Sequence, residues 1–240
     1  MIGAALFEPP GVAGKRRDEG RRLADAMSPL LGRSSLPPGP HRDEARLLYI
    51  LSHVPVGGRH FADVGGNTGV LSFELLGWGA RRVDYHEGHP THHAFMRIAA
   101  EQLGLADRLH TCPRYASLAA AQRPTVDCAF LLNTQPAGGS DGASRLQAVP
   151  DGLAAIARTS RTLVFQPGAP GPQSALIRAV EHATAADWTV TAIGIAERVG
   201  GRIRYRDGAA RDIPRDGSPG DPPDRPLFIL ASRHAVPAVI

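Results

Sequence analysis

One stretch decides the fold, Phe61-Ala-Asp-Val-Gly-Gly-Asn-Thr-Gly-Val-Leu-Ser72. An apolar run ends in an acidic residue, a glycine-bearing turn follows, and the apolar spacing from Val70 onward is typical of a helix. This order predicts a strand, a turn and a helix whose N-terminus and neighbouring backbone N–H groups face a ligand. Gly65, Gly66 and Gly69 permit backbone angles and a close approach that a side chain would block.

A second acidic residue, Glu87, ends the strand-like run Arg82-Val-Asp-Tyr-His86. An acid at the tip of the second strand can accept hydrogen bonds from a ribose diol. Together the glycine turn and this acid predict a site for a nucleoside cofactor. The alternatives are a turn with no ligand, a purely turn-capping role for Asp63, and a solvated strand end at Glu87.

The turn has the spacing Asp-x-Gly-x-Asn-x-Gly from Asp63 to Gly69, whereas a dinucleotide site usually has Gly-x-Gly-x-x-Gly. This spacing resembles the first motif of the class I S-adenosylmethionine (SAM) dependent methyltransferases. Asn67 replaces the commoner Gly of that motif, and Asn tolerates left-handed backbone angles better than most residues. The resemblance covers roughly residues 42–234. The run Gly77-Trp-Gly-Ala-Arg-Arg-Val83 is similar to the wobble-uridine tRNA methyltransferase-like branch of the family.

The resemblance implies SAM as the cofactor. Asp63 would help to hold its amino-acid part, and Glu87 would bind its ribose. The family's acid after the third strand is missing from Pro113-Arg-Tyr-Ala-Ser-Leu118, so Tyr115 or adjoining backbone is expected to meet the adenine. Asn133, at the end of the fourth predicted strand, either lines the methyl-transfer pocket or caps its strand. The implied cofactor-binding residues are Asp63, Gly65, Gly66, Asn67, Gly69, Glu87, Tyr115 and Asn133.

The sequence leaves the catalytic residue open among Asn133, His92 and His93. Four histidines flank Glu87, and two of them, His89 and His93, share a helical face at a spacing that can hold a metal. A histidine here could instead act as a base, and the simpler alternative is hydrogen bonding near the ribose with exposed imidazoles. We predict no metal site.

A zinc site is not expected from the cysteines either. The chain has two, Cys112 and Cys128, and neither has a Cys-x-x-Cys partner. Both lie inside strand-like runs, so we expect free thiols in a reducing cytoplasm.

Strands that alternate with helices predict a Rossmann-like α/β fold. We expect a seven-stranded, mostly parallel sheet with an antiparallel closing strand and helices on both faces. The expected strands are 60–64, 82–86, 108–112, 126–132, 161–166, 188–195 and 227–231, with a hairpin candidate at 202–208. The expected helices are 43–53, 68–77, 90–104, 144–158 and 174–183. In the first of them, Leu47, Leu48, Ile50 and Leu51 are expected on the buried side.

The chain has 240 residues, 42% of them hydrophobic, which is enough for one domain with a substantial core. We assign residues 42–240 to the methyltransferase domain and 1–41 to a helical extension. This extension either packs over the sheet edge or acts as a lid over the substrate. No apolar run approaches 18 residues and no secretory signal is recognised, so we expect a cytoplasmic protein without a membrane span.

The predicted function is methyl transfer from SAM to an O or N atom of a small molecule, in specialised metabolite biosynthesis. The net charge of +4 is spread along the chain and is not by itself a nucleic-acid footprint. One alternative is a tRNA-modifying methyltransferase, which a clustered basic face including Arg16, Arg17, Arg21 and Arg22 would support. Another is a non-catalytic SAM-binding partner of a second protein. The oligomeric state is left open.

Overall fold

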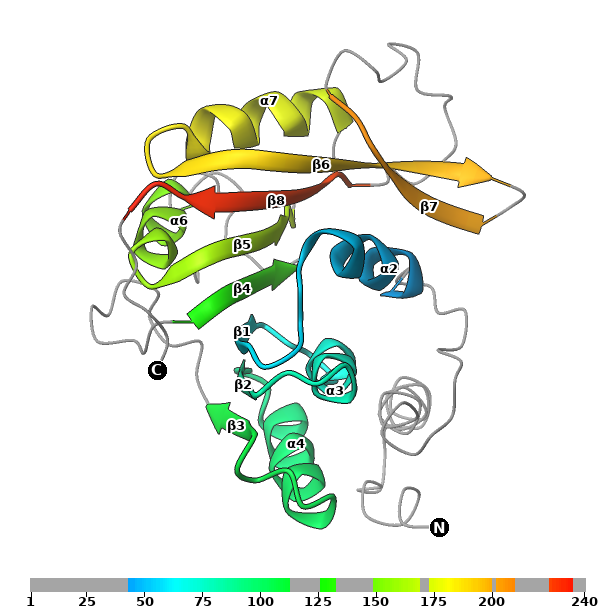
Figure 1. Cartoon of the computed structure of the whole chain (residues 1–240), viewed down its shortest axis with the longest axis vertical. Helices are drawn as coiled ribbons and strands as arrows, with labels where there is room; N and C mark the ends of the chain where they lie inside the picture. The colour runs from blue at the N-terminus through cyan, green and yellow to red at the C-terminus, as the bar shows by residue number, and fades with distance from the viewer. Residues whose placement is uncertain are drawn as a thin grey trace, which may run out of the picture.

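The computed structural model describes residues 43–112, 126–132, 149–168, 173–199, 202–209 and 225–234. The predicted extension 1–41, Tyr115 and Asn133 lie outside these residues. The described strands form one sheet in the order β3-β2-β1-β4-β5-β8-β6-β7 (Figure 1). Their bounds are β1 His60–Val64, β2 Arg82–His86, β3 Leu109–Cys112, β4 Val126–Leu132, β5 Ser160–Gln166, β6 Trp188–Val199, β7 Arg202–Asp207 and β8 Leu227–Ser232.

Helices connect most of these strands. Their bounds are α2 Asp43–His53, α3 Val70–Gly77, α4 Pro90–Gln102, α6 Val149–Ala157 and α7 Gln173–Thr184. Strands β1 to β5 pair in parallel, and β8 runs antiparallel between β5 and β6. The Rossmann-like α/β fold with helices on both faces and an antiparallel closing strand is therefore confirmed. The carboxyl ends of β1 and β2 meet side by side because Val64 pairs with His86.

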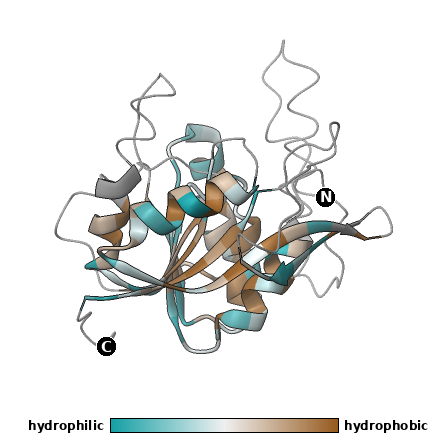
Figure 2. Cartoon of the chain, turned by 90° about the horizontal axis from the view of Figure 1, so that it is seen from above, coloured by the Kyte–Doolittle hydropathy of each residue, from teal (hydrophilic) through white to brown (hydrophobic). Residues whose placement is uncertain are grey.

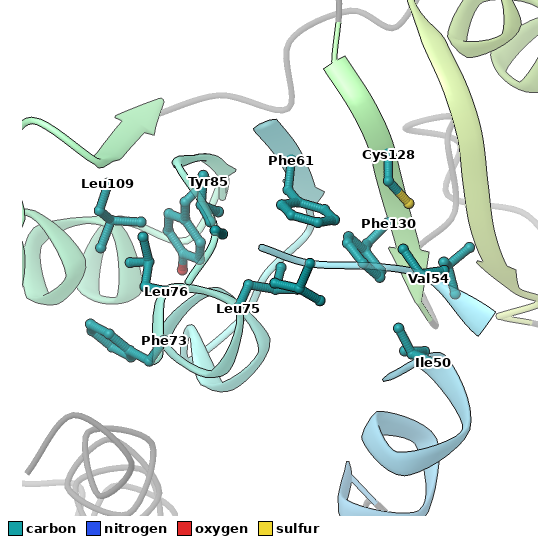
Figure 3. Packing of buried hydrophobic residues seen from close by; sticks show 14 of the residues in the cluster. Ile50, Val54, Phe61, Phe73, Leu75, Leu76, Tyr85, Leu109, Cys128 and Phe130 are labelled. Carbon is teal, nitrogen blue, oxygen red and sulfur yellow. The ribbon is translucent and has the colours of Figure 1, made fainter. Parts of the chain in front are cut away.

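Both faces of the sheet are covered, because alternate strand residues point to opposite sides. One apolar core joins the sheet to α2, α3 and α4, and its strand residues include Phe61, Tyr85, Cys128 and Phe130 (Figure 3). The other joins it to α6 and α7, through Ala62, Ala129, Leu131 and Leu163. Figure 2 shows hydrophobic residues along the strands in the middle and a mixture of hydrophobic and hydrophilic residues in the helices on either side.

The sheet has eight strands rather than the seven predicted. Strand β6 continues to Val199, and the segment predicted as a hairpin at 202–208 is the single strand β7, which pairs antiparallel with β6. In the run Ile203-Arg-Tyr-Arg206, partly buried Ile203 and Tyr205 alternate with exposed arginines, as expected of an edge strand with one charged, solvent-facing side.

The buried side of α2 also differs from the prediction. Leu48 is 62% exposed, whereas Arg46, Leu47, Tyr49 and Ile50 are buried. The helix therefore turns a charged residue inward. Among the described residues, no helix has both the length and the apolar character needed to cross a membrane.

Candidate active site

The turn after β1 holds three residues in left-handed backbone conformation. These are Gly65 at φ 74°, Asn67 at φ 51° and Gly69 at φ 78°, and Gly69 caps the N-terminus of α3. The amide of Gly65 donates to the carbonyl of His86 at 2.8 Å, and the amide of Gly69 donates to the carbonyl of Gly66 at 2.8 Å. The predicted strand, turn and helix are therefore present. Asn67 adopts the left-handed backbone conformation that the sequence analysis expected an asparagine to tolerate.

Glu87, directly after β2, is 3% exposed and lies against this turn. Its Oε2 accepts a hydrogen bond from the amide of Asn67 at 2.8 Å, and its Oε1 accepts one from the amide of His89 at 2.7 Å. The alternative of a solvated strand end is therefore wrong. A carboxylate can accept hydrogen bonds from several donors at once.

Asp63 lies at the end of β1 and is 4% exposed. Its Oδ2 accepts a hydrogen bond from the hydroxyl of Ser72 in α3 at 2.7 Å. Burial raises the pKa of Asp63 to about 6, and the Glu87 charge adds to this rise, while the Ser72 hydroxyl and the Arg46 charge oppose it. Two carboxylates thus face one turn, and Asp63 links this turn to the first helix beyond it.

Two of the turn glycines are required by the packing of the protein itself. A Cβ at Gly66 would lie 2.5 Å from Cε2 of Tyr85, and one at Gly69 would lie 2.2 Å from Sδ of Met96. The Tyr85 hydroxyl also donates to the carbonyl of Asn67. The turn is therefore pressed against β2 and α4, and this close packing holds its backbone N–H groups in place.

The histidine cluster opens α4. His89 is the N-cap residue, and its ring centroid lies 4.4 Å from that of His92. The prediction of exposed imidazoles is wrong for His92, which is 8% exposed. His93 Nε2 is buried and makes no hydrogen bond within the described part of the chain. In that same part, no three His, Cys, Asp or Glu side chains converge as metal ligands would.

Sequence reasoning missed a polar network at the same edge of the sheet. Arg46 of α2 donates from Nη1 to Oε1 of Gln166, at the end of β5, at 3.0 Å. Gln166 Nε2 in turn donates to the Tyr205 hydroxyl at 2.9 Å and to the Arg225 carbonyl at 3.0 Å. Helical spacing could have indicated that Arg46 is buried. Arg46 lies three residues before Tyr49 and four before Ile50, so all three share one face of the helix.

Comparison with solved structures places this geometry among known folds. A protein of Streptococcus pneumoniae described as a candidate tRNA (m1A22) methyltransferase matches 80% of this chain and 72% of its own, with a TM-score of 0.50 and 16% identity. TrmN from Thermus thermophilus matches 88% of this chain with a TM-score of 0.54 and 16% identity. Only 52% of TrmN is covered, so the chain spans about half of its length.

The chain has the fold of the class I SAM-dependent methyltransferases. The glycine turn after β1 and the acid after β2 lie at the edge of this methyltransferase fold where the parallel strands end. No protein-family model and no curated protein matches the sequence. The resemblance to the wobble-uridine branch therefore stays a prediction.

Proposed function

We propose that the protein binds SAM and transfers its methyl group to an O or N atom of a small molecule. One observation carries the proposal. The left-handed turn from Gly65 to Gly69 lies between two buried carboxylates, Asp63 and Glu87, at the carboxyl edge of a methyltransferase-fold sheet. Such an edge is where ligands bind in open α/β sheets.

The residues present suit the two polar ends of this cofactor. Glu87 is a buried acceptor at the turn, where its carboxylate holds the backbone amides of Asn67 and His89, and the ribose of a bound cofactor is expected to meet this carboxylate. Asp63 offers an anion for the ammonium group of the amino-acid end. SAM supplies a methyl group on a sulfonium, which is a good leaving group, so the main task of the protein is to align the acceptor with it.

A tRNA acceptor is the second candidate, and one comparison favours it. The protein of Streptococcus pneumoniae that shares the fold is itself described as a candidate tRNA methyltransferase. The arginines at 16, 17, 21 and 22 that would support this reading lie outside the described residues. The described hairpin β6–β7 adds exposed Arg204 and Arg206, and Arg206 pairs with Glu197 at 2.9 Å, which compensates part of this positive charge.

Two measurements test the proposal. Calorimetry should show SAM or S-adenosylhomocysteine (SAH) binding with a micromolar-order dissociation constant, about −8 kcal/mol, and no comparable binding of NAD. Radiolabelled methyl transfer is then compared between pooled tRNA and a small-molecule library of hydroxyl and amino compounds. Transfer to tRNA alone establishes the second candidate. SAM binding without transfer to either class supports a non-catalytic partner.

A further inference from the structure

The edge of the sheet where the parallel strands begin lies opposite the glycine turn and has no part in the proposed function. We propose that this edge binds single-stranded nucleic acid, with a base stacked on Trp78 and phosphates held by Arg59 and Arg81. These residues lie in two turns, 55–59 before β1 and 78–81 between α3 and β2. The proposal goes beyond methyl transfer, because the surface needs neither SAM nor a methyl acceptor to bind its ligand.

Backbone hydrogen bonds hold the two turns side by side. The amide of Gly58 donates to the carbonyl of Gly79 at 2.8 Å, and the amide of Arg81 donates to the carbonyl of Arg59 at 2.8 Å. Arg59 and Arg81 therefore lie at the starts of neighbouring strands, which are spaced about 4.8 Å apart. Trp78 is in the same turn as Arg81, so all three residues come from one compact piece of backbone.

Trp78 presents an aromatic ring to solvent at the C-terminal end of α3. It is 57% exposed, whereas tryptophans are on average highly buried. The ring is nevertheless held in place, because its indole N–H donates a hydrogen bond to the carboxylate of Glu74, a residue that is 6% exposed. A base that stacks on a ring of fixed orientation therefore loses little of its binding energy to ordering the protein.

Glycines keep the two turns open around this ring. Gly77 and Gly79 flank Trp78, and both are exposed. At Gly57 and Gly58 in the other turn, an added Cβ would meet nothing within 4 Å. A sugar–phosphate chain can therefore approach the backbone of both turns closely, and the residues on each side of Trp78 have no side chain to cover the ring.

The arginines supply the positive charge of this surface. Arg81 is exposed and Arg59 is partly exposed, and within the part of the chain that the structure describes neither side chain makes a hydrogen bond or an ion pair. A third cation, Arg108, adds to the local charge, while its guanidinium donates to the carbonyls of Leu76 and Ala80 at 3.0 and 2.6 Å. Like charges this close repel one another, and bound phosphates offset the repulsion.

Two acids near this edge are engaged by groups of the protein. Asp84 binds Arg82 at 2.7 Å and His60 at 2.8 Å, and Asp127 accepts a hydrogen bond from the amide of His60 at 2.9 Å. Asp107, directly before β3, is exposed and is expected to oppose the binding of phosphates. Its neutralisation therefore gives a test of opposite sign.

The combination of an open aromatic ring with unpaired cations favours a single strand as the ligand. Proteins that bind single strands join a cationic surface for the backbone to aromatic side chains on which bases stack. In a duplex the bases stack on one another, which leaves no base face for Trp78. An acidic protein surface would pair with Arg59 and Arg81 without using the ring, and it is the alternative that the experiment separates.

The tryptophans of the chain, which are two in number, allow a direct measurement. Trp188 is 1% exposed, and its indole N–H is bonded to the carbonyl of Leu153, so a ligand at the surface should change the emission of Trp78 alone. Oligo(U) and oligo(dT) of equal length are titrated in turn at low salt. We expect both to quench this emission, and the tighter of the two identifies RNA or DNA as the ligand.

Trp78→Leu tests the stacking contact. The variant should lose the quenching and should bind fluorescently labelled oligomer about tenfold more weakly, because the planar partner of the base is gone. Trp78→Phe keeps an aromatic ring and should restore part of the affinity.

Arg59→Gln and Arg81→Gln test the phosphate contacts. Each should weaken binding of the labelled oligomer and reduce the slope of log Kd against log salt concentration by about 0.7, the effect of one phosphate contact on a single strand. Arg178→Gln is the matched control, because Arg178 is an exposed arginine of α7, which packs on the opposite face of the sheet from α3. It should leave affinity and slope unchanged, whereas Asp107→Asn should tighten binding.

Three results would overturn the proposal. The wild type could bind neither oligomer at low salt. Arg178→Gln could weaken binding as much as Arg81→Gln, which would show attraction to the overall charge of the protein. Heparin, a polyanion without bases, could bind as tightly as the oligomers and leave the emission of Trp78 unchanged, which would assign the surface to acidic partners such as a protein.

Calorimetry with SAH separates this proposal from the proposed function. The variants at Trp78, Arg59 and Arg81 should bind SAH as the wild type does, because the glycine turn lies at the other edge of the sheet. A wild type that binds oligo(U) but not SAH would contradict the proposed function and support the nucleic-acid surface.

Discussion

The carboxylate of Glu87 accepts a hydrogen bond from the backbone amide of Asn67, with 2.8 Å between Oε2 and N. This contact joins the acid that follows β2 to the left-handed residue of the turn that follows β1. We expect a substitution at either residue to destabilise the turn, because Asn67 has a left-handed backbone at φ 51° and Glu87 is only 3% exposed. The acid expected to meet a ribose therefore also holds the shape of the turn.

Glu87→Ala is expected to lower the free energy of unfolding by about 2–4 kcal/mol, because two backbone amides lose a charged acceptor. Urea denaturation measures this loss. Glu101→Ala is the control, since Glu101 makes an exposed i,i+4 pair with Arg97 and should cost under about 0.5 kcal/mol. A Glu87 variant as stable as the control would mean that the two hydrogen bonds do not hold the turn.

Much of the fold could be predicted because most strands are recognisable from their own local sequence. Strands 60–64, 82–86 and 126–132 were predicted with the bounds observed, since apolar runs between turn residues mark covered parallel strands. The pairing of β7 with β6 could not be predicted in the same way. It depends on the partner that a polar, Arg-rich segment finds, which local periodicity does not encode.

The residues of the candidate site also differ in how well the sequence predicts them, depending on whether their signal is local or comes from a distant partner. Asp63 and the turn glycines were predicted because they belong to one local motif, and Glu87 because it directly follows the next strand-like run. Arg46 was missed because apolar residues, among them Leu48, were assumed to define the buried side of α2. Arg46 is buried through its partner Gln166, which lies 120 residues away in sequence. Long-range polar pairing of this kind leaves no periodic trace.

Gly69→Ala is expected to lower the free energy of unfolding by about 2–4 kcal/mol. The new methyl group would meet Met96 Sδ at 2.2 Å, and the backbone is left-handed at φ 78°. Gly104→Ala is the matched control, because Gly104 has φ 64° and nothing within 4 Å of the added atom. It should cost only about 1 kcal/mol. Equal losses in urea denaturation would show that Met96 yields and that packing does not require glycine.

Gln173→Ala is expected to loosen the part of β6 that extends past β8. The pairing of β6 with β8 ends at Gly194, and the Gln173 side chain then bonds both backbone groups of Ala196, at 3.0 and 3.1 Å. We expect a loss of about 1–2 kcal/mol in stability and faster amide exchange at Ala196. Glu181→Ala, an exposed change on the same helix, is the control and should leave that exchange unchanged. Unchanged exchange in the Gln173 variant would contradict the prediction.

The stability of the protein should depend on pH through Asp63. Its pKa is about 6 in the folded protein against 3.8 for the free group. Between these values the folded state binds more protons than the unfolded state, so the free energy of unfolding falls as pH rises from about 4 to 6. The full effect is about 3 kcal/mol. Asp63→Asn lacks this titration and can still accept the Ser72 hydrogen bond. Urea denaturation at several pH values should therefore show the wild type losing stability relative to Asp63→Asn as pH rises, and a constant difference between the two proteins would contradict the raised pKa.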